Sequence, residues 1–106
     1  MGANLSTTVS SDVLTCPAEK VLKINTISVS NIDGTNAADV TVYFYDLSAL
    51  QRYSLATTVS VPADSTLIVL GKDAPIYLEE GDKIQALASA AGDLEIVISY
   101  EELDDA

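Results

Sequence analysis

The sequence predicts an all-β fold: a single-domain antiparallel β-sandwich of about eight strands with jelly-roll-like connections. Polar and apolar residues alternate with period two through most of the chain, whereas no long segment repeats apolar residues at helical spacing. Gly, Pro, Asn and Asp interrupt the alternation every 8–12 residues or so, which is typical of a sandwich or barrel. An immunoglobulin-like sandwich is the second choice, because the Cys, Trp, Cys pattern of that fold is missing.

The first half of the chain contains two predicted strands of unequal clarity. Leu5 to Ser10 is weakly apolar and is expected to be an edge strand or an arm. Lys20 to Asn31 is a long extended segment in which the apolar residues change from even to odd positions near Asn25 and Thr26. This change predicts either a bulge or a strand that crosses from one sheet to the other. The Asp33-Gly34 pair then predicts a turn.

The clearest strand is Asp39 to Asp46, where Val40, Val42 and Phe44 share one face. Tyr43 and Tyr45 share the other face. A loop from Leu47 to Gln51 is expected to form one helical turn at most. The remaining predicted strands are Arg52 to Val61, Thr66 to Leu70, Pro75 to Leu78, Lys83 to Ser89 and Leu94 to Tyr100.

The length and composition agree with one domain over residues 1–106. Single domains most often contain about 100–150 residues, and the chain has 106 residues of which 48% are hydrophobic. That content supplies a core without a disulfide framework or a structural metal. An extended N-terminal arm is expected over residues 1–11. The acidic C-terminal tail over residues 101–106 is expected to fray unless a partner holds it, because its charges repel one another.

The formal charge of −11, with 5 basic and 16 acidic residues, argues against two classes of partner. Nucleic acid and anionic membrane surfaces both require clustered Lys and Arg, and the basic residues here are scattered. The longest aliphatic run, Leu67 to Leu70, is too short to cross a bilayer. The amino terminus lacks the basic start and apolar stretch of a signal peptide.

No catalytic constellation is present, so we expect neither an enzyme nor a cofactor. The chain has no histidine and one cysteine, which excludes His-dependent triads and zinc sites built on Cys and His. Without a histidine to activate it, Cys16 is expected to be a small buried hydrophobe. Two acid-rich turns carry oxygen ligands of the kind that calcium prefers, but neither matches a calcium loop, and turn chemistry explains both. Their residues are Asp33, Asn36, Asp39, Glu79, Glu80 and Asp82.

Tyr43 and Tyr45 are the first candidates for a protein contact, because exposed tyrosines are typical of interfaces. Arg52 is grouped with them, with the alternative that Arg52 and a neighbouring strand simply cover the two rings. The other candidate contact residues lie in the N-terminal segment: Leu5, Thr7 and Val9.

Four stretches of the sequence carry a family resemblance that covers most of the chain after residue 20. They are SNIDGT (Ser30 to Thr35), VTVYFYD (Val40 to Asp46), SVPADSTLIVL (Ser60 to Leu70) and PIYLEEGDKIQALASAAGDLEIVISYEE (Pro75 to Glu102). In these stretches the chain resembles small virion proteins of tailed bacteriophages, especially those that infect aquatic bacteria.

The resemblance implies a structural virion protein, in the first place a capsid decoration or cement protein on the outer surface of the phage head. Its partners would be the major capsid protein and copies of itself, as a homotrimer, and it would be made in the cytoplasm of the host bacterium. An anionic chain is repelled by packaged DNA, which agrees with an outer position. Two other roles stay open, namely a tail or head-to-tail accessory protein and a glycan- or cell-surface-binding module.

Overall fold

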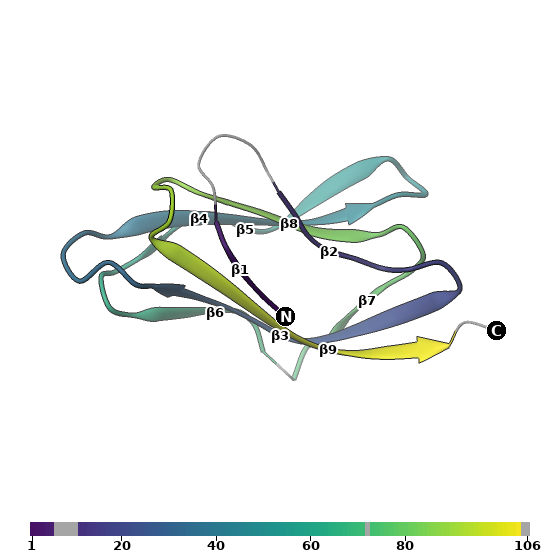
Figure 1. The fold of residues 1–106 in the computed structure, drawn as a ribbon. Coiled ribbons are helices and arrows are strands. Elements are labelled where there is room, and N and C mark those ends of the chain that lie inside the picture. Colours follow the sequence, from purple (N-terminus) through teal and green to yellow (C-terminus); the bar gives the residue numbers. More distant parts are fainter. Residues whose placement is uncertain (6–10, 72, 105–106) are drawn as a thin grey trace.

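The chain folds into two packed antiparallel sheets (Figure 1), which confirms the all-β prediction. The computed structural model describes residues 1–5, 11–71 and 73–104, and these contain nine strands. The first sheet has the order β1 (Gly2–Asn4), β9 (Leu94–Asp104), β3 (Lys20–Asn31) and β6 (Thr66–Leu70), with β7 (Ile76–Leu78) also paired to β3. The second sheet has the order β2 (Ser11–Thr15), β8 (Lys83–Ala88), β4 (Ala38–Asp46) and β5 (Gln51–Val61).

The pairing of these strands is nested, which is the connectivity of a jelly roll. β4 pairs with the next strand, β5. Around that hairpin, β3 pairs with β6, then β2 with β8, and finally β1 with β9. The strands therefore pair like the two arms of one long hairpin that has been rolled into a sandwich. The jelly-roll prediction is confirmed, and β7 is an additional short strand that pairs with β3.

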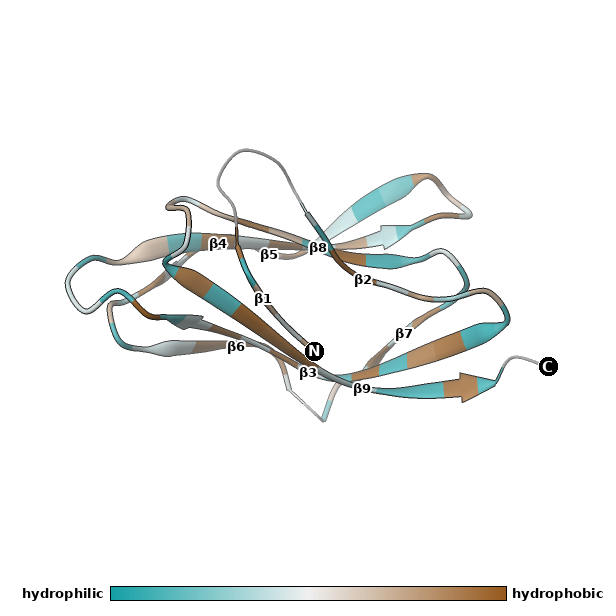
Figure 2. Cartoon of the chain, viewed as in Figure 1, coloured by the Kyte–Doolittle hydropathy of each residue, from teal (hydrophilic) through white to brown (hydrophobic). Residues whose placement is uncertain are grey.

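The core lies between the sheets and is built from the inward positions of each strand. Figure 2 shows hydrophobic residues alternating with hydrophilic ones along β3 and β9. This alternation buries one face of each sheet and leaves the other in contact with water. The largest side chains that are fully buried include Leu22, Ile24, Ile27, Leu78, Ile84, Leu94, Ile96 and Ile98.

A bulge in β3 explains the change of parity in its sequence. The register between β3 and β9 shifts between Ile24 and Thr26, so that Asn25 is an extra residue on β3. Because of this shift, Ile24 before the bulge and Ile27 after it both reach the core. Of the two predicted explanations the bulge is confirmed, since β3 stays within one sheet.

Both ends of the described chain pair within the fold. β1 pairs with β9, and Leu5 is buried in the core. At the other end, residues 101–104 continue β9 and pair with β3. The expectation of a frayed acidic tail was therefore wrong for these residues. Opposite charge on β3 explains the difference, because Lys23 lies opposite Glu101 in register and Lys20 forms an ion pair with Asp104.

The acidic turn between β7 and β8 connects three loops. Asp82 is 5% exposed, and its carboxylate accepts hydrogen bonds from the backbone N–H groups of Leu47 at 3.0 Å and Glu79 at 2.9 Å. The carbonyl of Asp82 accepts a third bond, from the N–H of Cys16 at 2.9 Å. Next to it, Gly81 has a φ of +84°, and a Cβ there would lie 2.2 Å from Cδ2 of Leu47. The turn is therefore a structural joint that requires glycine at this position.

We expect Gly81→Ala to lower the free energy of unfolding by about 1–3 kcal/mol, the usual strain of a left-handed backbone at a residue with a side chain. Urea denaturation measures the loss. The matched control is Gly71→Ala, where an added Cβ meets no atom within 4 Å and where little change is expected. Equal losses in the two variants would contradict this account of the turn.

Candidate functional site

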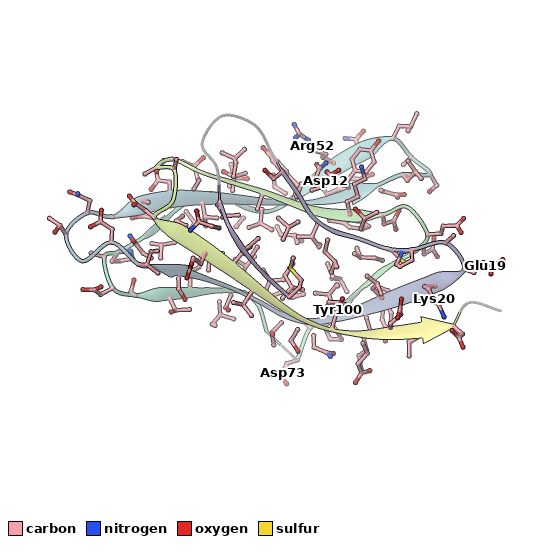
Figure 3. The ribbon with its side chains drawn as sticks, in the orientation of Figure 1. Asp12, Glu19, Lys20, Arg52, Asp73 and Tyr100 are labelled. Carbon is pink, nitrogen blue, oxygen red and sulfur yellow. The ribbon has the colours of Figure 1, made fainter. Side chains whose placement is uncertain are left out.

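The outer face of the second sheet brings together three of the residues that the sequence predicts as contacts. Strand alternation directs Tyr43 and Tyr45 of β4 away from the core, and Arg52 of β5 lies opposite Tyr45 in register. Figure 3 shows Arg52 and Asp12 on the same upper side of the molecule, away from β9. We call the outer side chains of this region the tyrosine–cation face: Asp12, Tyr43, Tyr45, Arg52, Lys83 and Gln85.

Cations cover both tyrosine rings. The Cζ atom of Arg52 lies 4.3 Å from the centroid of the Tyr43 ring, and Nζ of Lys83 lies 5.8 Å from that of Tyr45. Contacts of this kind stabilise a surface modestly and orient the cation over the ring. Both tyrosines are half-buried. The cations therefore cover the rings in part, as in the alternative, and the remainder of each ring stays exposed.

Asp12 of β2 binds Lys83, the cation that lies over the Tyr45 ring. Its carboxylate forms an ion pair with Nζ of Lys83 at 2.9 Å and accepts a hydrogen bond from Nε2 of Gln85 at 2.7 Å. The Gln85 hydrogen bond and then the Lys83 ammonium lower the pKa of Asp12 below its ordinary value. Sequence reasoning missed these three residues, because β2 and β8 are far apart in the chain and only the sheet pairing joins them.

The tyrosine–cation face has a wide, shallow hollow of about 550 Å³. It is lined by Tyr45, Leu50, Gln51, Arg52 and Gln85. The face contains two cations, Arg52 and Lys83, and one carboxylate, Asp12, whereas the whole chain has a formal charge of −11. Such a surface is suited to contact with anionic or hydroxyl-rich groups.

The remaining predicted contact residues do not join this face. Leu5 is 2% exposed and belongs to the core, which corrects its assignment to an interface. The physical reason is that Leu5 continues the line of β1, where its N–H donates to the carbonyl of Leu94 at 2.9 Å. Thr7 and Val9 lie outside the described residues.

The acidic side chains of the two acid-rich turns accept hydrogen bonds from the protein's own backbone. Asp33 accepts backbone hydrogen bonds from Thr35 at 2.8 Å and Asn36 at 3.4 Å, and the Thr35 bond is the largest cause of its lowered pKa. In the second turn, Glu80 accepts the N–H of Glu19 at 2.8 Å. Within the described ranges, no three His, Cys, Asp or Glu side chains gather closely enough to hold a metal ion.

Cys16 is buried and free, as the sequence predicts. Its thiol donates to the carbonyl of Lys20 at 3.1 Å. Burial raises the pKa of this thiol, so that the reactive thiolate is disfavoured. Cys16 therefore behaves as a small core residue.

Comparison with known proteins found no match to a family model, to a curated protein or to a solved structure. The described residues contain no helix that is long and apolar enough to span a membrane.

We expect Asp12→Asn to lower the free energy of unfolding at pH 7 by at most about 1 kcal/mol, because the ion pair is half-exposed and screened by water. The folded pKa of Asp12 is lowered, so its contribution is full above the unfolded pKa of about 4. It is lost as the pH falls through the folded value.

Urea denaturation between pH 7 and pH 3 tests this dependence. The difference between wild type and Asp12→Asn should shrink below about pH 4. Lys83→Met should show a similar loss at pH 7, and the double variant should lose less than the sum of the two. Additive losses would show that the pair does not interact.

Proposed function

We propose that this chain is a non-enzymatic structural virion protein that decorates the outer surface of a tailed-phage capsid. One observation carries the proposal: the stretches that resemble small virion proteins are the same stretches that build the sandwich. Val40 to Asp46 lies in β4, Ser60 to Leu70 contains the turn and strand β6, and Pro75 to Glu102 contains β7, β8 and most of β9. The resemblance thus concerns strands of both sheets, with β4 and β8 in the second sheet and β6, β7 and β9 in the first.

The charge of the chain supports an outer position. With −11 formal charges, the protein would be repelled by the packaged DNA inside a head. The sandwich measures 48 × 26 × 18 Å and so offers broad faces for contact with a shell. The single free cysteine means that folding requires no disulfide, which suits synthesis in a bacterial cytoplasm before assembly.

The tyrosine–cation face supplies a surface for the proposed contact with the major capsid protein. It carries half-buried tyrosines and an arginine, residues that are enriched in protein interfaces. The cation contacts hold Tyr43 and Tyr45 in place before binding, which reduces the entropy lost on association. A homotrimer, in which each copy uses the same patch, is the assembly that we propose.

An electron-cryomicroscopy map of the parent particle tests this function. We expect density of the size and outline of this sandwich at repeated positions on the outer capsid lattice. Density in the tail or at the head-to-tail junction would instead assign the accessory role. The absence of such density from the lattice would falsify the decoration role.

The double variant Tyr43→Ser/Tyr45→Ser tests the contact surface in the same system. It should fold, since both side chains lie on the outer face, but binding to capsids that lack the protein should weaken by about tenfold or more, as for the loss of aromatic anchors. Tyr77→Ser on the other sheet is the control, because Tyr77 is 53% exposed and lies away from this face. A larger loss for Tyr77→Ser would assign the contact to the first sheet.

A glycan-binding module is the second candidate, and the observation that favours it is the gathering of Tyr45, Arg52 and Gln85 around one shallow hollow, with the ring of Tyr43 against the Arg52 guanidinium. Aromatic and planar polar side chains of this kind suit hydroxyl-rich ligands. This role would be supported if the purified protein bound host-cell surface polysaccharide and the particle map placed the chain on the tail.

A further inference from the structure

Strand β9 is paired on both sides only along its first half. β1 lies beside Glu95 to Val97, and the pairing ends where the Met1 amino group donates to the carbonyl of Ile98 at 2.7 Å. The N–H of Ile98 donates to the Met1 carbonyl at 2.8 Å. Beyond this point β9 continues to Asp104 with β3 as its partner on one side (Figure 1). Among the described residues, no strand pairs with the other side.

The backbone groups on that side follow from the alternation of the strand. The carbonyl of Leu94 and both backbone groups of Ile98 point toward the N-terminal segment. Every second residue of a strand points its N–H and C=O groups the same way. Tyr100, Glu102 and Asp104 therefore direct theirs to the open side, whereas the groups of Ser99, Glu101 and Leu103 face β3. The extra residue of the bulge is on β3, so it leaves this alternation intact.

The acidic side chains of this edge disfavour pairing with a second copy of the chain and favour pairing with a basic strand. All six residues from Ser99 to Asp104 are exposed, and three of them are acidic. Two copies that met antiparallel along this edge, in the register centred on Glu102, would place Glu102 of one copy opposite Glu102 of the other, and like charges directly opposite are destabilising. On β3, Lys23 lies opposite Glu101 and Lys20 forms an ion pair with Asp104. Glu102, in contrast, lies opposite the uncharged Leu22. A basic strand on the open side would place its cation beside Glu102.

We propose that the open edge of β9, from Ser99 to Asp104, accepts an extended segment of a partner protein that carries lysine or arginine at alternate positions. The segment adds as a further strand of the first sheet, beside the part of β9 that β1 leaves unpaired. Backbone hydrogen bonds to Tyr100 and Glu102 hold it, and charge selects its sequence. The ring of Tyr100 and the side chain of Leu103 are exposed on opposite faces of the sheet, and each offers the added segment one apolar contact. This inference rests on the fold and holds whichever role the protein has in a particle.

The probe is a capped octapeptide of alternating lysine and valine, and the acidic comparison peptide alternates glutamate and valine. Amide chemical shifts and amide hydrogen exchange of the labelled protein, at about physiological ionic strength, report where each peptide binds. We expect the basic peptide to shift and protect the Tyr100 and Glu102 amides, while the acidic peptide leaves them unchanged. Equal effects of the two peptides, or shifts confined to other regions, would overturn the proposal.

Two variants at one position separate strand addition from simple charge attraction. Glu102→Pro removes an N–H that points to the open side, a change that edge strands tolerate, and should weaken peptide binding by about tenfold or more. Glu102→Ser removes the same charge but keeps the N–H, and should lose clearly less binding than Glu102→Pro. Equal losses in both variants would mean that the peptide binds by charge alone, against the proposal.

A change on the peptide gives the same test without altering the protein. Methylating the backbone nitrogens of the lysines keeps every charge and, in the antiparallel register that places a lysine opposite Glu102, removes the donors that face β9. The methylated peptide should lose binding, and if it bound as well as its parent, strand addition would be excluded. If adding peptide raised the molecular mass in solution by that of a second protein copy, the result would point instead to association between copies.

Discussion

The pairing of β3 with β9 is the constraint on which the rest of the fold depends. These are the longest partners of the first sheet, with 12 and 11 residues; on its other side β9 pairs with β1, and β3 pairs with β6 and β7. The extra residue at Asn25 lets one continuous strand supply inward side chains from both of its halves. A β3 without the bulge would turn one set of apolar residues to water, because a shift of one residue exchanges the two faces.

Two buried polar side chains close the ends of the sandwich against water. Asn31 is 3% exposed and donates from Nδ2 to the carbonyls of Asn36 and Val61, both at 2.9 Å, while its Oδ1 accepts the N–H of Asp33 at 2.8 Å. Asp82 has the same task at the turn between β7 and β8. Each replaces backbone pairs that a loop cannot form, which is how buried polar groups are normally satisfied. The surfaces available for binding are therefore the sheet faces and edges.

The sequence predicted the fold well wherever alternation is strong. Strands from Lys20 onward, the change of parity in β3 and the outward direction of Tyr43 and Tyr45 all follow from the period of the side chains. β1 and β2 were missed because they are short and polar, and their partners lie about 70 residues away or more. Because of the same separation along the chain, the sequence did not predict that Asp12 contacts Lys83 and Gln85. The tail was misread because repulsion within the segment can be read from sequence, whereas attraction from Lys20 and Lys23 on another strand cannot.

The nested pairing also sets the order in which the chain can fold. β4 and β5 are neighbours in sequence, so they form a hairpin at small cost in loop entropy. β1, in contrast, cannot pair until β9 is available at the other end of the chain. On a ribosome, β1 and β2 emerge well before the strands that complete them. The polar, serine- and threonine-rich character of this first stretch then has a use of its own: a segment that stays unpaired during synthesis gains solubility from having few large apolar side chains.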